Sequence, residues 1–228
     1  MALEHVVVRT IIRADATVVA RLAAVGVAAA HEAQGRRGLL DPAVRPVQTG
    51  VRVAGPAVTV LCQPGDNLMI HLAVEHCQPG DVLVVAMSSA SSDGMLGELL
   101  ATSLRAHGAI AAVVDAGVRD VAELRAMGFP VWSRWVSARG TSKHGAGNVN
   151  RQIVCAGQAV AAGDVIVADD DGVVCVPQHS GAQVADEAER RAAREEATRG
   201  RLASGELTAD LLGLREVADR VGITTIDR

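Results

Sequence analysis

Short, almost wholly apolar runs alternate with amphipathic stretches through the middle of the chain. The segments AVTVLC (57–62), DVLVVAM (81–87), IAAVVDA (110–116) and PVWSR (130–134) are predicted to be strands. Helical patterns fall between them, over 67–77, 94–107 and 120–127. Strands that are apolar throughout and alternate with helices are typical of parallel pairs in βαβ units. The pattern therefore predicts an α/β fold.

The two ends of the chain add helices and a second group of strands. Residues 15–33 are predicted to form a helix that Asp15 caps and Gly35 stops. QIVCAG, VIVADD and GVVCVP, all between 152 and 177, are predicted strands, and an Asp-Gly turn at 171–172 joins the last two. The charged stretch 181–220 is predicted to be helical, with a break at Gly205. No segment has the composition of a linker, so we expect one α/β domain at 1–180 and a C-terminal helical extension at 181–228.

Composition excludes some classes of function. Hydrophobic residues make up 49% of the chain, but there are only one Phe, two Trp and no Tyr, and the net charge is -4. Few aromatic side chains are available to stack on bases, and the surface is not basic, so we expect no nucleic-acid partner.

Cysteine usage and the N-terminal residues indicate where the protein works. The four cysteines show no CxxC spacing, and each lies in or beside an apolar run: Cys62, Cys77, Cys155 and Cys175. Such residues are expected to be buried thiols in a reducing compartment. No basic segment with a long apolar core opens the chain, and no apolar run approaches ~18 residues. We therefore expect a cytoplasmic protein that has no membrane partner.

Arg119 and Asp120 stand side by side where a predicted strand meets a helix. Active groups of α/β folds gather at the carboxyl ends of strands, so Asp120 is a candidate for chemistry and Arg119 for binding a carboxylate or an enolate. The alternative is that Asp120 caps the helix that follows, with Glu123 completing a capping box. Neighbouring side chains on an extended or turning backbone diverge, so we do not expect the two charges simply to pair with each other.

The segment GMLGELLATSLRAHG (94–108) offers a possible anion site. Gly94 and Gly97 bracket the expected start of a helix, whose first turn leaves amide groups unpaired, and Glu98 adds a carboxylate there. The alternative is a helix with an irregular start and an apolar face of leucines.

Other polar clusters are less promising. The acidic run at 169–171 looks like a metal site, but an Asp-Gly hairpin turn explains it better. The histidines show no HxxxH or HxH spacing for zinc. Lys143 is the only lysine and lies in the glycine-rich loop 137–152, where it suits binding of a carboxylate better than Schiff-base chemistry.

Several segments together resemble a known family. They are GELLA (97–101), VVDAGVRDVAEL (113–124), GFPVW (128–132) and VCAGQAVAAGDVIVADDDGVVCVP (154–177). These segments are similar to those of the RraA-like fold group, and within it to the class II pyruvate aldolases; the C-terminal GELTADLLGLRE (205–216) favours the aldolases. The resemblance implies an αββα sandwich with a central mixed sheet and a helical tail that packs on the same or a neighbouring subunit. It also implies a homotrimer or homohexamer with sites between subunits.

The resemblance also implies roles for individual residues at the strand–helix junctions. Asp120 and Glu98 would hold Mg²⁺ or Mn²⁺, largely through its waters. Arg119 would contact the oxygens of the pyruvyl group. The backbone amides of Leu99 and Leu100, which follow Gly97, would receive the substrate carboxylate.

Three further residues match substrate-binding positions of the family. Lys143 matches a lysine of the substrate pocket. Glu32 matches an acidic residue that a neighbouring chain offers across the interface, and so does Glu195, where the adjacent Glu196 permits a slip of one residue in the match.

The implied activity is retro-aldol cleavage of 4-hydroxy-4-methyl-2-oxoglutarate or 4-carboxy-4-hydroxy-2-oxoadipate to pyruvate and a second 2-oxo acid. Oxaloacetate decarboxylation passes through the same enolate and is expected as a side activity. The main alternative is the non-catalytic regulator of ribonuclease activity in the same fold group. A methyltransferase would need a nucleoside loop, but no GxGxG follows the first strand. A class I aldolase would use Lys143.

Overall fold

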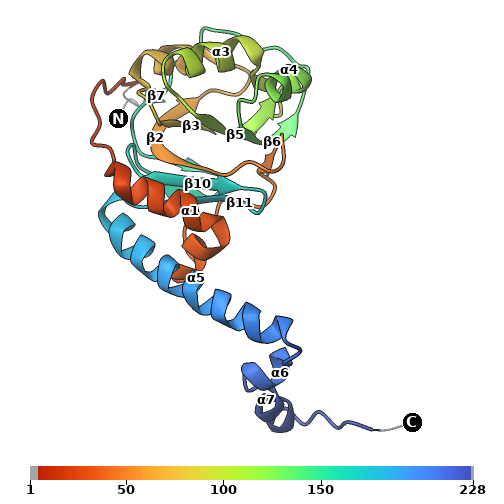
Figure 1. Ribbon diagram of the computed structural model, residues 1–228. Coiled ribbons are helices and arrows are strands. Elements are labelled where there is room, and N and C mark those ends of the chain that lie inside the picture. Colours follow the sequence, from red (N-terminus) through yellow and green to blue (C-terminus); the bar gives the residue numbers. More distant parts are fainter. Residues whose placement is uncertain (1–4, 227–228) are drawn as a thin grey trace. The chain divides into compact units, whose positions relative to one another are not determined.

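The ten-residue strand β2 (Val53–Cys62) is shared by the two halves of one bent sheet, and each half of the strand pairs with a different neighbour. From Ala57 onward it runs parallel to β3 (Val82–Met87), whereas Val53 to Pro56 pair antiparallel with β10 (Val165–Asp169). The computed structural model, which describes residues 5–226, therefore has a mixed sheet in the order β1-β6-β5-β3-β2-β10-β11 (Figure 1).

The parallel part of the sheet consists of three βαβ units. The strands β3, β5 (Ala111–Val118) and β6 (Val131–Val136) follow β2 in parallel register, and β1 (Arg45–Pro46) closes this edge antiparallel to β6. The crossover helices are α2 (Leu68–Ala73), which a 3-10 turn (Val74–His76) extends, α3 (Glu98–Ala106) and α4 (Val121–Ala126). The α/β prediction and the parallel pairing are confirmed.

Three apolar clusters separate four layers, which confirms the αββα sandwich. The first cluster joins α2, α3 and α4 to the parallel strands through residues such as Ile70, Leu104 and Leu124. The second lies between the two halves of the bent sheet and contains Trp132 and Ile166. The third joins β10 and β11 (Gly172–Val176) to α1 (Ala16–Ala33) and to the start of α5 (Gly181–Ala203).

Helix α1 begins where the sequence predicts. Asp15 is its N-cap, and its carboxylate accepts a hydrogen bond from the amide of Thr17. An interruption at Gly26 (φ 81°), which the periodic pattern did not reveal, kinks the helix. Within residues 5–226, α1 is the one helix long and apolar enough to cross a membrane, but its buried side chains Leu22 and Val27 pack against the sheet.

Two predicted boundaries are corrected. Gly94 does not start a helix: Gly94–Leu96 forms the short strand β4 beside β5, and the helix begins at Glu98. The amide of Gly94 donates to the carbonyl of Arg139, so tertiary pairing holds this segment extended. In the β10–β11 hairpin, the two-residue loop is Asp170-Asp171, and Gly172 already pairs with Asp169.

The acidic run at 169–171 has a structural role. Asp169 is buried, and its Oδ2 accepts from the amide of Val27 at the kink of α1. Asp170 accepts from the amide of Gly50. These hydrogen bonds fasten the hairpin to neighbouring segments.

The remaining short strands are β7 (Asn148–Val149), which pairs with β2, and the hairpin of β8 (Ile153–Cys155) and β9 (Gln158–Val160); a 3-10 turn (Gln178–Ser180) precedes α5.

The chain divides into two units between Ala188 and Glu189, inside α5. The second unit holds the rest of α5, α6 (Thr208–Leu211) and α7 (Leu214–Arg220). The helical tail is confirmed, with a third helix that the sequence did not predict; which subunit the tail packs on stays a prediction.

Candidate functional site

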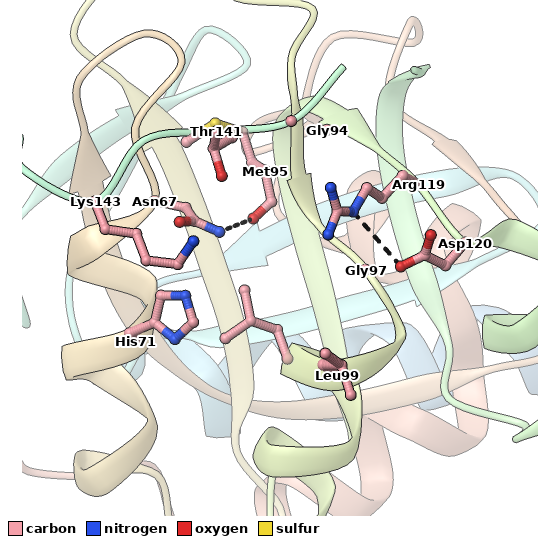
Figure 2. Close-up of a pocket in the computed structure, with 12 residues that line it drawn as sticks. Asn67, His71, Gly94, Met95, Gly97, Leu99, Arg119, Asp120, Thr141 and Lys143 are labelled. Atoms are coloured by element: carbon pink, nitrogen blue, oxygen red, sulfur yellow. Dashed lines mark hydrogen bonds and ion pairs between the residues drawn. The ribbon is translucent and has the colours of Figure 1, made fainter. Parts of the chain in front are cut away.

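A cavity of about 200 Å³ opens at the carboxyl ends of the parallel strands (Figure 2). Its walls come from the start of α2, from β4 and α3, from the β5–α4 junction and from the loop after β6. The lining residues are Asn67, His71, Gly94, Met95, Gly97, Leu99, Leu100, Arg119, Asp120, Gly140, Thr141 and Lys143. A cavity of this size suits a small-molecule ligand.

A tight crossing of two loops forms one wall of the cavity. Asp120 has a left-handed backbone (φ 54°, ψ 43°), a conformation that Asp tolerates better than most residues. Its carboxylate and the side chain of Arg119 then lie over Gly97, where an added Cβ would come within 2.3 Å of Asp120 Oδ2 and 3.0 Å of Arg119 Cγ. Gly97 is therefore required by close approach, although its own backbone is extended.

Asp120 does not cap its own helix. It occupies the N-cap position of α4, but its side chain makes no capping hydrogen bond there. Instead, Oδ2 accepts from the amide of Glu98, in the first turn of α3, at 3.1 Å. The capping-box alternative is wrong, because the left-handed backbone turns the carboxylate toward α3 and the cavity.

The expectation that Arg119 and Asp120 would not pair needs correction. Arg119 Nε lies 3.6 Å from Asp120 Oδ2, a distance that permits attraction but exceeds that of a good hydrogen bond (Figure 2). The side chains are 44% and 40% exposed, so water screens the pair. Both groups keep capacity to bind a ligand.

The first turn of α3 supplies further donors. Its N-cap is Gly97, which has no side chain to satisfy the amides that follow. Glu98 donates its amide to Asp120, and helix geometry leaves the amides of Leu99 and Leu100 without acceptors in the helix. Both leucines line the cavity, so the predicted anion-binding amides lie beside Arg119.

Lys143 and His71 line the side of the cavity opposite Arg119 and Asp120 (Figure 2). Partial burial, and then the positive charge of Lys143, lower the pKa of His71 from its ordinary value of 6.5. His71 is thus neutral near pH 7. Among the described residues, Lys143 makes no hydrogen bond or ion pair, so its ammonium group is available to a ligand.

The oxygen donors at this site fit a magnesium-type ion that keeps most of its waters. Oδ2 of Asp120 is engaged by the Glu98 amide, whereas Oδ1 accepts no hydrogen bond within residues 5–226. The Glu98 carboxylate accepts from Thr102 Oγ1 and does not line the cavity, so its role as a metal ligand stays a prediction. No three His, Cys, Asp or Glu side chains converge in the described part of the chain. One open carboxylate can suffice for Mg²⁺ but not for a tetrahedral zinc cage.

Two predicted binding residues lie elsewhere. Glu32 is in the last turn of α1, beyond the β10–β11 part of the sheet, and accepts from Arg36. Glu195 is on α5 in the second unit and pairs with Arg191. Neither lines the cavity of its own chain, so their contribution from a neighbouring subunit stays a prediction.

Sequence reasoning did not name five of the lining residues as site residues: Asn67, His71, Met95, Gly140 and Thr141. Asn67 is buried and its Nδ2 donates to the carbonyl of Met95; His71 lies one helical turn further along α2, and Thr141 is in the loop of Lys143. The signal was available for Asn67, because it follows the carboxyl end of strand 57–62, where ligands of α/β folds bind.

Comparison with known proteins places this geometry in context. Residues 14–175 match a family described as RraA-like: Aldolase/RraA. A protein of Halalkalibacterium halodurans with the name "Putative 4-hydroxy-4-methyl-2-oxoglutarate aldolase" is 32% identical over 158 residues, which cover 69% of this chain and 75% of that protein. A protein of Burkholderia multivorans with the same name is 35% identical over 148 residues, 64% of this chain and 90% of its own length.

A solved structure is also similar. RraAS2 of Streptomyces coelicolor, described as an unusual member of the RNase ES inhibitor RraA protein family, superimposes with a TM-score of 0.75 at 29% identity. The match covers 83% of this chain and 99% of RraAS2. The likeness therefore includes proteins named as enzymes and proteins named as inhibitors.

Proposed function

The chain belongs to the RraA-like family, Aldolase/RraA, and from that premise we propose that it is a divalent-metal-dependent carbon–carbon lyase acting on 2-oxo acids. The proposed reaction is retro-aldol cleavage of a 4-hydroxy-2-oxo acid, with 4-hydroxy-4-methyl-2-oxoglutarate and 4-carboxy-4-hydroxy-2-oxoadipate as candidate substrates. The products are pyruvate and a second 2-oxo acid. The names of two relatives, each a putative 4-hydroxy-4-methyl-2-oxoglutarate aldolase, support the first of these substrates.

One observation carries the proposal. Arg119, the free amides of Leu99 and Leu100, and the open oxygen of Asp120 meet on the same wall of a small cavity. Hydrogen-bond donors for a carboxylate and its adjacent 2-oxo group therefore lie beside a carboxylate that can bind a metal ion. A 2-oxo acid that chelates a metal requires this combination.

The residues of this chain have separable roles in such a cleavage. The amides of Leu99 and Leu100 would bind the C1 carboxylate, and the forked guanidinium of Arg119 would stabilise the oxygen that becomes negative. Asp120 would hold Mg²⁺ or Mn²⁺, which when bound acts as a Lewis acid toward the 2-oxo group.

The reaction balances without a redox partner. The 4-hydroxyl gives up its proton to water, the C3–C4 bond breaks, and its electron pair remains as the enolate of pyruvate. One proton then returns to C3. Loss of CO₂ from oxaloacetate leaves the same enolate, so decarboxylation is proposed as a side activity.

Assembly and location complete the proposal. A homotrimer or homohexamer would bring Glu32 and Glu195 of a neighbouring subunit to the cavity. Buried thiols at all four cysteines suit a reducing cytoplasm.

A pyruvate-release assay across a panel of 2-oxo acids, with Mg²⁺ and with EDTA, tests the function. We expect pyruvate from at least one 4-hydroxy-2-oxo acid in Mg²⁺ and none in EDTA. Pyruvate release that EDTA does not affect, together with a covalent pyruvate adduct of the enzyme after borohydride reduction, would point to a lysine Schiff base and contradict the proposal.

A ribonuclease inhibitor is the second candidate, because RraAS2 is described as belonging to an inhibitor family. A protein that only binds a ribonuclease has no need of an open carboxylate beside Arg119. Inhibition of an RNase E-type ribonuclease, together with no pyruvate release from any 2-oxo acid, would favour this candidate instead.

A further inference from the structure

A buried carboxylate, Asp66, lies behind the wall of the cavity that carries Lys143. Its side chain belongs to a residue only 4% exposed, just before α2. Oδ2 accepts two short hydrogen bonds, from Ser142 Oγ at 2.6 Å and from the amide of His144 at 2.6 Å. These two donors flank Lys143, so the carboxylate binds the loop on both sides of that residue.

Backbone hydrogen bonds also hold this loop against the residues that precede α2. The amide of Ser142 donates to the carbonyl of Gly65 at 2.8 Å, and the amide of Asn67 donates to the carbonyl of Ser142 at 3.1 Å. At Gly145 an added Cβ would lie 3.0 Å from Asp66 Cγ, so the loop passes against the carboxylate where a larger residue would crowd it. Loop and α2 start are thus joined over several consecutive residues.

The charge of Asp66 makes the loop conformation costly to lose. Burial raises the pKa of Asp66, but hydrogen bonds from His144, Ser142, Leu68 and Gly145 outweigh it and lower the pKa to about 2. Within residues 5–226 no cationic side chain pairs with this carboxylate. If the loop moved away, a buried anion would lose its donors, and such unsatisfied groups are strongly unfavourable.

Asp66 also ties the loop to the other cavity residues of α2. Its Oδ1 accepts from the amide of Leu68 at 3.0 Å, in the first turn of the helix that carries His71. One carboxylate therefore links the segment of Lys143 to the segment of Asn67 and His71. A carboxylate that served stability alone would not need to join two walls of one cavity.

We propose that Asp66 is a positioning residue, which fixes the loop 140–147 so that Lys143 faces the bound substrate. This inference rests on the proposed function only in assigning a substrate to Lys143. Asp66 itself does not line the cavity, and it acts on the ligand through Lys143.

A double-mutant cycle tests this route. Asp66→Asn keeps the size of the side chain but places an NH₂ group against at least one donor; we expect kcat/KM to fall about 10- to 100-fold, chiefly through a higher KM, as in Lys143→Ala. In the Lys143→Ala background, Asp66→Asn should change kcat/KM by less than about twofold, because coupled residues are not additive. An equal loss with and without Lys143 would refute positioning.

Ser142→Ala is the second variant, because it removes one hydrogen bond and leaves the buried charge satisfied by the rest. This variant keeps the test decisive if Asp66→Asn does not fold. Its effect on kcat/KM should likewise be much smaller in the Lys143→Ala background than in the wild type. Asp164→Asn is the matched control: Asp164 is also a buried carboxylate that accepts from backbone amides, of Ala161 and Gln178, but it does not line the cavity. Its folded fraction should keep wild-type kcat and KM.

Hydrogen exchange of the full-length protein separates this inference from the proposed function. In Asp66→Asn and Ser142→Ala, the amides of 140–147 should exchange faster than in the wild type, whereas Asp164→Asn should leave them unchanged. Unchanged exchange in both loop variants would overturn the inference. If the wild type cleaves no 2-oxo acid, the proposed function is wrong, and the exchange comparison still decides whether Asp66 anchors the loop.

Discussion

The amide of Glu98 donates a hydrogen bond to Oδ2 of Asp120, so the residue that opens α4 caps the start of α3. This single contact joins two βαβ units at the edge where the cavity lies. The second oxygen of this carboxylate accepts no hydrogen bond within residues 5–226. Structure and proposed chemistry therefore depend on different oxygens of one side chain.

The first prediction separates these two roles. Asp120→Asn can still accept the Glu98 amide through its remaining oxygen, so the melting temperature should change little. It cannot supply an anionic ligand to a cation, and we expect Mg²⁺-dependent pyruvate release to fall by at least about 100-fold. An Asp120→Asn protein that keeps its turnover and its sensitivity to EDTA would contradict the metal role.

Arg119→Lys tests the geometry of the cation that faces the substrate. A lysine ammonium keeps the charge but loses the planar fork, so kcat should fall about 100-fold with little loss of stability. Arg139→Lys is the matched control, because Arg139 is 76% exposed, pairs with Asp93 and does not line the cavity. Steady-state kinetics of both variants checks this; a near-normal kcat for Arg119→Lys would refute contact with the enolate.

Gly97→Ala tests the crossing of the two loops. The new methyl group would meet Asp120 Oδ2 and Arg119 Cγ, so both side chains must shift. We expect a loss of about 1–3 kcal/mol in unfolding free energy and about 100-fold in kcat/KM.

The control for this prediction is Gly200→Ala, a helical glycine of α5 whose added Cβ would meet no atom within 4 Å. It should be neutral or stabilise the protein by up to about 1 kcal/mol. Equal melting temperatures for Gly97→Ala and the wild type, measured by calorimetry, would show that the crossing is looser than the structure implies.

Local sequence patterns predicted the parts of the fold that depend on local physics. The apolar runs identified the parallel strands, because buried strands need side chains that are apolar on both faces. Asp15 was predicted as a cap from its place before a periodic stretch, and its side chain does cap α1. For Asp120 the same rule offered a cap of its own helix as the alternative reading, and this alternative is wrong. A left-handed backbone that turns a cap residue toward another helix leaves no pattern in neighbouring residues.

Contacts between distant segments were beyond sequence reasoning. Asp66 and His144 are 78 positions apart, and only the folded chain brings them together. Gly94 looked like a helix start in the sequence. Its actual partner, the carbonyl of Arg139, lies in the loop after β6, and no local pattern around Gly94 reveals that contact. In contrast, Gly97, Arg119, Asp120 and Lys143 were predicted as site residues by their family resemblance, and they do share one cavity.

The last prediction concerns acid. The pKa of Asp66 is about 2 in the folded protein against an ordinary value of 3.8, so the unfolded chain takes up the proton first as pH falls. The stabilising contribution is complete above pH 4 and is lost between about pH 4 and pH 2; the lowered pKa corresponds to about 2 kcal/mol of stability. Asp66→Asn lacks this titration. The difference in unfolding free energy between wild type and variant should therefore be about 2 kcal/mol larger at pH 6 than at pH 2, as measured by urea denaturation. A difference that does not change with pH would show that the carboxylate titrates normally and that the loop of Lys143 is held by its backbone contacts alone.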